Sequence, residues 1–481
     1  MKYYIGIDLG TSAMKLLLVN EDREVIKTVS KEYPLSFPRP SWSEQSPEDW
    51  WTALKDGMGE LLTEDQAKRV KALGVAGQMH GLVILDREDN VIRPAILWND
   101  GRTHEETEYL NEAFGKEHLA ESTANIAFAG FTAPKLLWLK KNEPQSFEKI
   151  RKIMLPKDFL NYRMTGIHST DYSDASGMLL LDVKNKCWSK KMLSTCDISE
   201  DQLPTLYESY EAVGTLTEEA AKDLGLNSSV RVIAGAGDNA AAAIGMGTVN
   251  EGSCNISIGT SGTVLIPYDN FSQIQNNAIH NFCHANGRYH FMACILSAAL
   301  CNQWFCSNIL GDKDYESLQE KITDEMILKN EVYFLPYLMG ERSPINDTGA
   351  SGCFLGLRPD TTREDMLLAV LEGVSFAIRD NMEIVSSLGI DIKGSTVCGG
   401  GSRSPLWLKI LASVLNIELH VPTSEQGPGY GVALLSMGIK DQQPNIKQTI
   451  SPDEKLIARY ETKYQRFTKL YPSLKEFFKG E

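Results

Sequence analysis

The sequence predicts an α/β protein with two lobes, and three observations carry this prediction. The 481 residues are 42% hydrophobic and 23% charged, an ordinary globular composition in a chain too long for one compact core. Short strand-like runs are followed by alternating helical and strand patterns, which is typical of α/β proteins. The same order of elements occurs twice, so we expect duplicated βββαβα units with a central cleft between the lobes.

The first repeat begins as a meander of short strands bounded by turn-forming residues. Three strands are predicted at residues 3–8, 13–19 and 24–33. The segment 47–62 then has an acidic first turn and large apolar residues at helical spacing, so it predicts a helix. VKALGVAG predicts a strand that ends at Gln78, and a later helix is expected to begin at Asp238.

The second repeat has the same order. We predict a hairpin over residues 253–265, helices over 296–309 and 363–388, a strand over 395–400 and a helix from Pro405. No low-complexity segment marks the boundary between the repeats. We place it near Met246, so that the two lobes span residues 1–245 and 246–481.

Composition excludes several classes of partner. The net charge is -15 and no run rich in Lys or Arg interrupts it, so neither nucleic acid nor membrane is expected as a partner. The nine cysteines form no CxxC pair, and an odd number cannot pair completely within the chain. No signal-peptide pattern and no apolar stretch of membrane length is found, so we expect a cytoplasmic location.

A turn of Gly, Thr and Ser occurs in two similar segments of the chain, which raises the question of its function. IGIDLGTSAMKLLLV (residues 5–19) places Asp8 between an apolar run and this turn, and CNISIGTSGTVLIPY (residues 254–268) repeats it with Ser257 in place of the acid. Such a turn offers backbone N–H groups and hydroxyls at close approach, which suits phosphate. One copy alone favours a plain β-turn, because Gly, Thr and Ser are common turn residues, but two copies at matching places favour a clamp on a polyphosphate.

The single acid then has a role, because one carboxylate is enough to hold Mg²⁺, usually through its waters. We predict that Asp8 is this metal ligand. Lys15 follows on the next strand, where it faces either the phosphates or solvent. The residues expected at the polyphosphate are Thr11, Ser12, Lys15, Gly259 and Thr260.

A glycine-rich segment, VRVIAGAGDNAAAAIG (residues 230–245), satisfies GxGxxA at Gly235, Gly237 and Ala240 and invites a dinucleotide-binding interpretation. That interpretation is disfavoured because Asp238 would set a negative charge against a pyrophosphate at the helix N-terminus. An NAD-dependent dehydrogenase would also need an acidic residue about 20 residues further on, where the chain has the second hairpin. A helix N-cap is the structural alternative for Asp238.

The chain resembles the FGGY family of carbohydrate kinases over nearly its whole length. GFTAPKLLWLKKN (130–142) and GCFLGLRPDTTREDMLLAVLE (352–372) are similar to the signature segments of that family. GQMHG (77–81), PAILWNDGR (94–102) and SWSEQSPEDWW (41–51) are similar to the members that phosphorylate D-xylulose. The resemblance implies a two-lobed actin-like ATPase (ribonuclease H-like) fold, ATP and Mg²⁺ as cofactors, D-xylulose 5-phosphate as product, and a homodimer.

The resemblance also implies roles for individual residues. Asp238 matches the catalytic base, and the residues expected at the sugar are Gln78, Met79, His80, Asp238 and Asn239. GGGSRSP matches the adenosine site, and the residues expected there are Trp304, Gly399, Gly400, Gly401 and Arg403. Arg403 and Ser404 stand where relatives vary, so their contacts are left open.

Other functions are weighed against this one. A kinase for another ketose or polyol, such as ribulose, another xylulose isomer or glycerol, is the nearest alternative, because a few hydroxyl contacts decide among them. A chaperone or filament protein of the same fold would need a peptide-binding appendage or a polymerising surface. P-loop and protein-kinase motifs are absent from the sequence. The pair His280 and His284 has no third ligand at a convincing spacing for a metal centre.

Overall fold

The computed structural model describes residues 1–274, 278–423 and 427–479, which form two compact units. The first unit contains Met1–Val249, Asn281–His290 and Gln426–Pro444, and the second contains Asn250–His280, Phe291–Glu425 and Asn445–Glu481. The predicted division at residue 245 treats each lobe as continuous and does not include the two later segments of the first unit. That division stays a prediction.

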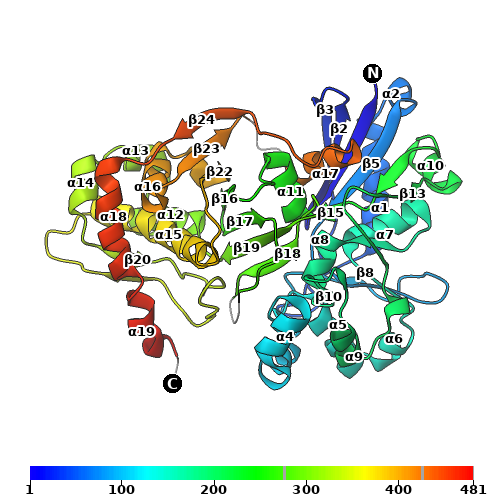
Figure 1. Ribbon diagram of the computed structural model, residues 1–481, viewed down its shortest axis with the longest axis horizontal. Helices are drawn as coiled ribbons and strands as arrows, with labels where there is room; N and C mark the ends of the chain where they lie inside the picture. Colours follow the sequence, from blue (N-terminus) through cyan, green and yellow to red (C-terminus); the bar gives the residue numbers. More distant parts are fainter. Residues whose placement is uncertain (275–277, 424–426, 480–481) are drawn as a thin grey trace. The chain divides into compact units, whose positions relative to one another are not determined.

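The first unit is built on a mixed seven-stranded sheet with helices on both faces (Figure 1). The three strands of the predicted meander and the strand predicted after them are all present at the apolar runs of the sequence. Along the sheet the order is β13 (Ala212–Thr215), β14 (Arg231–Ile233), β5 (Val70–Gly77), β1 (Tyr3–Leu9), β2 (Ala13–Asn20) and β3 (Val25–Glu32), and β15 (Ala236–Gly237) also pairs with β5.

Alternation along β1 assigns its side chains to two layers. Ile5, Ile7 and Leu9 pack into the core formed with α1 (Pro47–Leu61), α7 (Pro156–Thr165) and α10 (Glu218–Leu224). The other face carries α11 (Asp238–Met246) and α17 (Pro428–Ser436), which pack against each other (Figure 1). Gly6 and Gly429 lie so close that a Cβ atom at Gly6 would overlap the Gly429 carbonyl, so α17 rests directly on β1.

Short elements complete the first unit. Its other α-helices are α2 (Glu64–Ala67), α3 (His104–Glu108), α4 (Lys116–Thr123), α5 (Thr132–Asn142), α6 (Pro144–Glu148), α8 (Tyr172–Ala175) and α9 (Lys190–Cys196). Its small two-stranded sheets pair β4 (Glu44–Gln45) with β7 (Ala95–Ile96), β6 (Val83–Leu85) with β8 (Lys152–Met154), β9 (Ser169–Asp171) with β12 (Thr205–Tyr207), and β10 (Leu181–Asp182) with β11 (Cys187–Trp188).

The sheet of the second unit repeats the strand order of the first. Its seven strands lie in the order β18 (His280–Cys283), β19 (Tyr289–Ile295), β17 (Gly262–Tyr268), β16 (Asn255–Ile258), β22 (Gly394–Cys398), β23 (Glu418–Pro422) and β24 (Ile446–Ile450), where β18 is an added edge strand. The parallel registers agree as well, because Asp8 lies opposite Ala76 and Ser257 lies opposite Cys398, and these two partners each directly precede a glycine. The hairpin registers differ by one residue, because Asp8 pairs with Lys15 whereas Ser257 pairs with Thr263, the counterpart of Met14. The predicted duplication is therefore confirmed.

The helices of the second unit include one whose start differs from the prediction. They are α12 (Ala299–Trp304), α13 (Tyr315–Gln319), α14 (Asp324–Lys329), α15 (Arg363–Ser386), α16 (Pro405–Leu415), α18 (Glu454–Phe467) and α19 (Leu470–Phe478). The helix predicted over 296–309 begins at Ala299 and continues as a π-helix over Phe305–Leu310. It starts late because the backbone N–H of Ala298 donates to the carbonyl oxygen of Thr260, at 3.0 Å.

All nine cysteines are free thiols. Within the described ranges, no helix is both long and apolar enough to cross a membrane.

A buried ion pair fixes α18 to α15, and its removal should destabilise the protein. Lys463 Nζ lies 2.5 Å from Glu372 Oε2, and both side chains are inaccessible to solvent. Lys463→Met would leave Glu372 buried without its cation, so we expect a loss of about 3–5 kcal/mol in the free energy of unfolding, measured by urea denaturation. The double variant Lys463→Met/Glu372→Leu should recover most of this loss. If Lys463→Met is as stable as the wild type, the ion pair does not hold α18 to α15 in the way proposed.

Candidate active site

Three neighbouring strands of the first sheet end at the same edge. β1, β5 and β15 run parallel, with Leu9 opposite Gly77 and Gly77 opposite Gly237. Because the carboxyl ends of parallel strands meet at one edge, Asp8, residues 78–80 and Asp238 are brought close together. The structure therefore gathers the predicted acid, sugar and base positions of the first unit.

Asp8 lies on the face of β1 that also carries Gly6. Its neighbour across the antiparallel pair is Lys15, so the two side chains share this face. Burial raises the pKa of Asp8 to about 6, and the positive charge of Lys15 opposes the shift. Lys15 is exposed, which is compatible with both of its predicted roles.

The turn after β1 is held by side chains from three other segments. Gln45 Nε2 donates to the carbonyl oxygen of Thr11 at 2.6 Å, and Trp98 Nε1 donates to the Thr11 hydroxyl at 2.9 Å. The hydroxyl of Tyr33 donates to the carbonyl oxygen of Gly10. These bonds fix the turn before any ligand arrives, and the side chain that it leaves exposed is that of Ser12.

Gln78, one of the residues expected at the sugar, also belongs to this support. Its Nε2 donates to Gln45 Oε1 at 3.1 Å and to the carbonyl oxygen of Gly10 at 3.4 Å. Gln78 is buried, and its Oε1 has no hydrogen-bond partner in the part of the chain that the structure describes. Gln78 thus links the end of β5 to the turn after β1, and its contact with the sugar stays a prediction.

Met79 lies against Gly237, which precedes α11, and His80 lies against Gly177. A Cβ atom at Gly237 would be 3.0 Å from Met79 Sδ, so only glycine leaves room for Met79 there. His80 has a left-handed backbone, with φ of 68°, and its Nδ1 lies 2.7 Å from the carbonyl oxygen of Gly177. Since a carbonyl only accepts, Nδ1 carries the hydrogen, which makes Nε2 the acceptor in the neutral ring.

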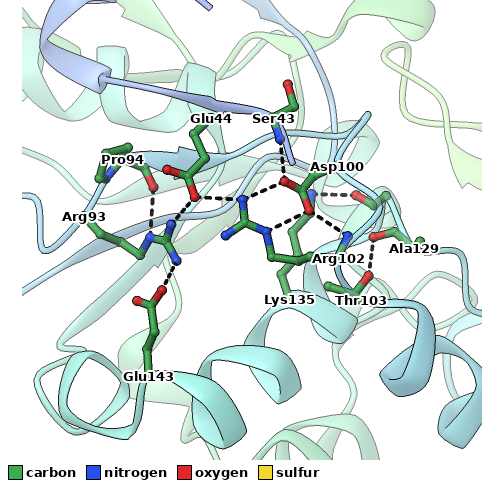
Figure 2. A network of polar contacts seen from close by, with 11 residues as sticks. Ser43, Glu44, Arg93, Pro94, Asp100, Arg102, Thr103, Ala129, Lys135 and Glu143 are labelled. Atoms are coloured by element: carbon green, nitrogen blue, oxygen red, sulfur yellow. Dashed lines mark hydrogen bonds and ion pairs between the residues drawn. The ribbon is translucent and has the colours of Figure 1, made fainter. Parts of the chain in front are cut away.

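A fully buried ammonium group holds the backbone of His80. Lys135 Nζ donates to the carbonyl oxygens of His80, at 2.8 Å, and Gly130, at 2.7 Å. Figure 2 shows it in a network where Arg102 binds Asp100 at 2.7 Å. Burial lowers the pKa of Lys135 to about 7, an effect that Asp100 opposes and Arg102 increases.

Asp238 is the first residue of α11, and the N-cap is Gly237. The structural alternative of an N-cap role for Asp238 is therefore wrong. Its Oδ1 instead accepts hydrogen bonds from the backbone N–H and from Nδ2 of Asn239, at 2.7 and 2.9 Å. Burial, then the negative charge of Asp8, raise the pKa of Asp238 to about 7, which suits a group that must accept a proton near neutral pH.

The second unit brings most of the expected nucleotide residues together around its own hairpin. A Cβ atom at Gly399, where φ is 86°, would lie 3.0 Å from the backbone nitrogen of Gly259, so the GGG segment touches the turn. The N–H of Ala299 donates to the carbonyl oxygen of Gly259 at 2.8 Å, and the same helix carries Trp304. Thr260 and Gly400 are exposed here, whereas Gly401 is buried.

Arg403 and Ser404 differ in their surroundings. Ser404 is the N-cap of α16: its Oγ accepts from the N–H of Trp407 at 3.0 Å and donates to Gln319 Oε1 at 2.5 Å. Arg403 is exposed and lines a cavity of about 640 Å³ that Lys447 also lines. Ser404 thus has structural partners, while Arg403 is available to a ligand.

The carboxylates of the first unit fit a divalent cation that arrives with a nucleotide. Among residues 1–274, 278–423 and 427–479, no group of three or more His, Cys, Asp and Glu side chains could hold a metal ion by itself. Mg²⁺ is typically bound by one or two carboxylates together with substrate phosphates and water. Asp8 and Asp238 have raised pKa values, and a cation beside them would stabilise their ionised forms.

The sequence does not predict several residues that support the site. Gln45, Trp98 and Lys135 lie in the segments that carry the family resemblance, yet nothing in those segments shows that they contact the turn or His80. Lys157 and Asp158, inside the apolar segment MLPKDFL, are a visible signal of buried charge. Each depends on contacts between segments far apart in the chain.

Comparisons with known proteins agree with these features. The N-terminal domain of the FGGY family of carbohydrate kinases matches residues 3–245, and its C-terminal domain matches residues 254–438. The xylulose kinase of Escherichia coli (strain K12) is 41% identical over 482 residues, 98% of this chain and 99% of that protein. The xylulose kinase of Klebsiella pneumoniae is 39% identical over 483 residues, with 98% and 99% covered. A crystal structure of a "xyloylose kinase" from Brucella ovis has a TM-score of 0.94 and 40% identity, covering 99% of this chain and 100% of that one.

Replacing Lys135 by Met should change how stability depends on pH. The folded pKa of about 7 lies below the ordinary value of 10.5, so between these values the unfolded chain binds more protons and stability rises with pH. We expect the wild type to gain stability relative to Lys135→Met from about pH 7 to about pH 9. Urea denaturation followed by tryptophan fluorescence measures this, and a constant difference between the two proteins would contradict the lowered pKa.

Proposed function

The chain belongs to the FGGY family of carbohydrate kinases, and we propose that it transfers the γ-phosphoryl group of ATP to the terminal hydroxyl of D-xylulose. The observation that carries this proposal is the position of Asp238, a carboxylate with a pKa near 7 that lies next to Met79 and within electrostatic reach of Asp8. High identity to two xylulose kinases over nearly the whole chain supports the choice of sugar.

Asp238 acts as the general base. It takes the proton of the sugar hydroxyl as the oxygen attacks the γ-phosphorus, the new O–P bond forms, and the bond to the β-phosphate oxygen breaks to release ADP. Asn239 holds the carboxylate through its Nδ2, and Met79 and His80 border the space beside it. The ring of His80 presents Nε2 as an acceptor for a sugar hydroxyl.

The remaining predicted residues bind the phosphates and the nucleoside of ATP. Asp8 would hold Mg²⁺, which would neutralise charge on the transferring phosphate. The exposed hydroxyls and N–H groups of the two turns contact the polyphosphate at Thr11, Ser12, Gly259 and Thr260, with Lys15 beside them. The adenosine lies against Trp304, Gly399, Gly400, Gly401 and Arg403.

A panel of acceptors tests the choice of sugar. D-xylulose, L-xylulose, D-ribulose and glycerol should be compared with ATP in an assay coupled to ADP release, and we expect the highest kcat/KM for D-xylulose. The differences arise because a few hydrogen bonds to hydroxyl groups decide among the acceptors. A higher kcat/KM for another ketose or for glycerol would assign that substrate instead. No ADP release with any acceptor would overturn the kinase proposal.

Replacing Asp238 by Asn should abolish turnover without harming the fold. The amide keeps an oxygen that accepts from Asn239 but cannot take a proton, so we expect a loss on the order of 10²-fold or more in kcat. Burial already disfavours the charged form of Asp238, so stability should be unchanged or slightly higher at neutral pH. Coupled assays measure kcat, and thermal melting measures stability.

Asp314→Asn is the matched control. Asp314 is an N-cap whose Oδ1 accepts from the N–H of Ser317 at 3.1 Å, and Asn caps a helix about as well as Asp. This variant should keep both its melting temperature and its turnover. If Asp238→Asn turns over as fast as Asp314→Asn, Asp238 is not the base.

A further inference from the structure

A lysine and three aspartates are buried together behind the strand end that carries Met79. Lys157 Nζ lies 2.7 Å from Asp158 Oδ1, 2.9 Å from Asp171 Oδ1 and 3.7 Å from Asp174 Oδ2, and none of the four side chains reaches solvent. Such a cluster costs desolvation energy and is weak as a source of stability. The mechanism described above assigns it no role.

The cluster is strongly charged at its centre. Burial alone would lower the pKa of Lys157, but the carboxylates of Asp158, Asp171 and Asp174 raise it, so the lysine keeps its proton. Burial raises the pKa of Asp174 well above its ordinary value, against the attraction of Lys157. Asp171 connects the cluster to neighbouring groups, because one of its carboxylate oxygens pairs with Lys157 and the other accepts from two hydroxyl groups.

A serine links the cluster to the start of α11. Asp171 Oδ2 accepts from the hydroxyls of Ser173, at 2.5 Å, and Ser209, at 2.7 Å. Because the single hydroxyl proton of Ser173 is given to a carboxylate, its oxygen is turned to accept from another donor. That donor is the backbone N–H of Gly237, at 3.1 Å, and Gly237 directly precedes Asp238.

Side-chain packing also connects the cluster to the end of β5. A Cβ atom at Gly77 would lie 2.7 Å from Lys157 Cβ, so the lysine stem lies directly against the last residue of β5. Gly77 pairs with Gly237, and the chain continues from it into Gln78 and Met79. The cluster thus contacts the end of β5, which leads to the residues expected at the sugar, directly through Lys157, and the end of β15, which leads to Asp238, through Ser173.

We propose that Ser173, oriented by Asp171 and Lys157, is a positioning residue that fixes the start of α11 and thereby the direction of the Asp238 carboxylate. This inference rests on the proposed role of Asp238 as the base. Ser173 touches no reacting atom in this scheme. It acts through the N–H of Gly237, whose anchoring sets the backbone from which the Asp238 side chain projects.

Ser173→Ala removes the link and leaves the charged cluster in place. The misplaced base should lower kcat about 10-fold or more, because small displacements of a catalytic group cost large factors in rate, while the KM for ATP stays within about twofold. Ser176→Ala is the matched control. Ser176 is also buried, donates to the carbonyl oxygen of Tyr172 at 2.7 Å and accepts from the N–H of Cys283 at 3.0 Å, and it has no bond to α11.

A double-mutant cycle separates positioning from a general loss of structure. In the Asp238→Asn background there is no base left to orient, so Ser173→Ala should lower the residual kcat less than twofold. An equal loss in both backgrounds, or a loss no larger than that of Ser176→Ala, would overturn the positioning role.

Hydrogen–deuterium exchange supplies a readout that does not depend on the substrate. Peptides that cover the start of α11 should exchange faster in Ser173→Ala than in the wild type and in Ser176→Ala, because the N–H of Gly237 has lost its acceptor. Unchanged exchange would overturn the link whatever the enzyme phosphorylates. Faster exchange in a protein that phosphorylates no sugar would instead leave the link standing and overturn the proposed function.

Discussion

The parallel pairing of β1, β5 and β15 is the constraint on which the candidate site depends. It places the end of each strand at one edge of the sheet, so Asp8, Met79 and Asp238 come together although they are far apart in the chain. The close approach of α17 to β1 at Gly6 then closes one face of this edge. If the pairing register of β1 shifted by one residue, the Asp8 side chain would lie on the opposite face of the sheet, in the hydrophobic core.

This gathering has an electrostatic consequence. Burial raises the pKa values of Asp8 and Asp238, and the negative charge of Asp8 raises that of Asp238 further. Among the described residues, neither carboxylate has an ion pair like the one that Lys157 makes with Asp158 at 2.7 Å. The two acids are therefore poised to gain stability from a cation, or to accept a proton. Lys157, in contrast, lies within ion-pair distance of three carboxylates, and one of them, Asp171, accepts from two hydroxyl groups with its other oxygen.

The second unit repeats the backbone of the first but not its chemistry. Ser257 occupies the register position of Asp8, and the segment that follows β22 is made of glycines instead of Gln, Met and His. One strand order thus carries an acidic edge in the first unit and an open glycine-rich edge in the second. Fold alone does not choose between these roles, because the side chains at the strand ends do.

The sequence by itself determined the succession of strands and helices along the chain, the duplication, the family and the identity of the residues at the strand ends, because periodicity, turn chemistry and motif spacing are local properties. It left open whether Asp238 caps its helix, since that depends on whether the helix begins at residue 238 or 239. Only the tertiary structure decided that Gly237 is the cap, that Gln78 holds the turn and that Lys135 and Lys157 are buried. The physical reason is that each of these contacts joins residues from different elements, and desolvation and hydrogen-bond geometry exist only once those elements have packed.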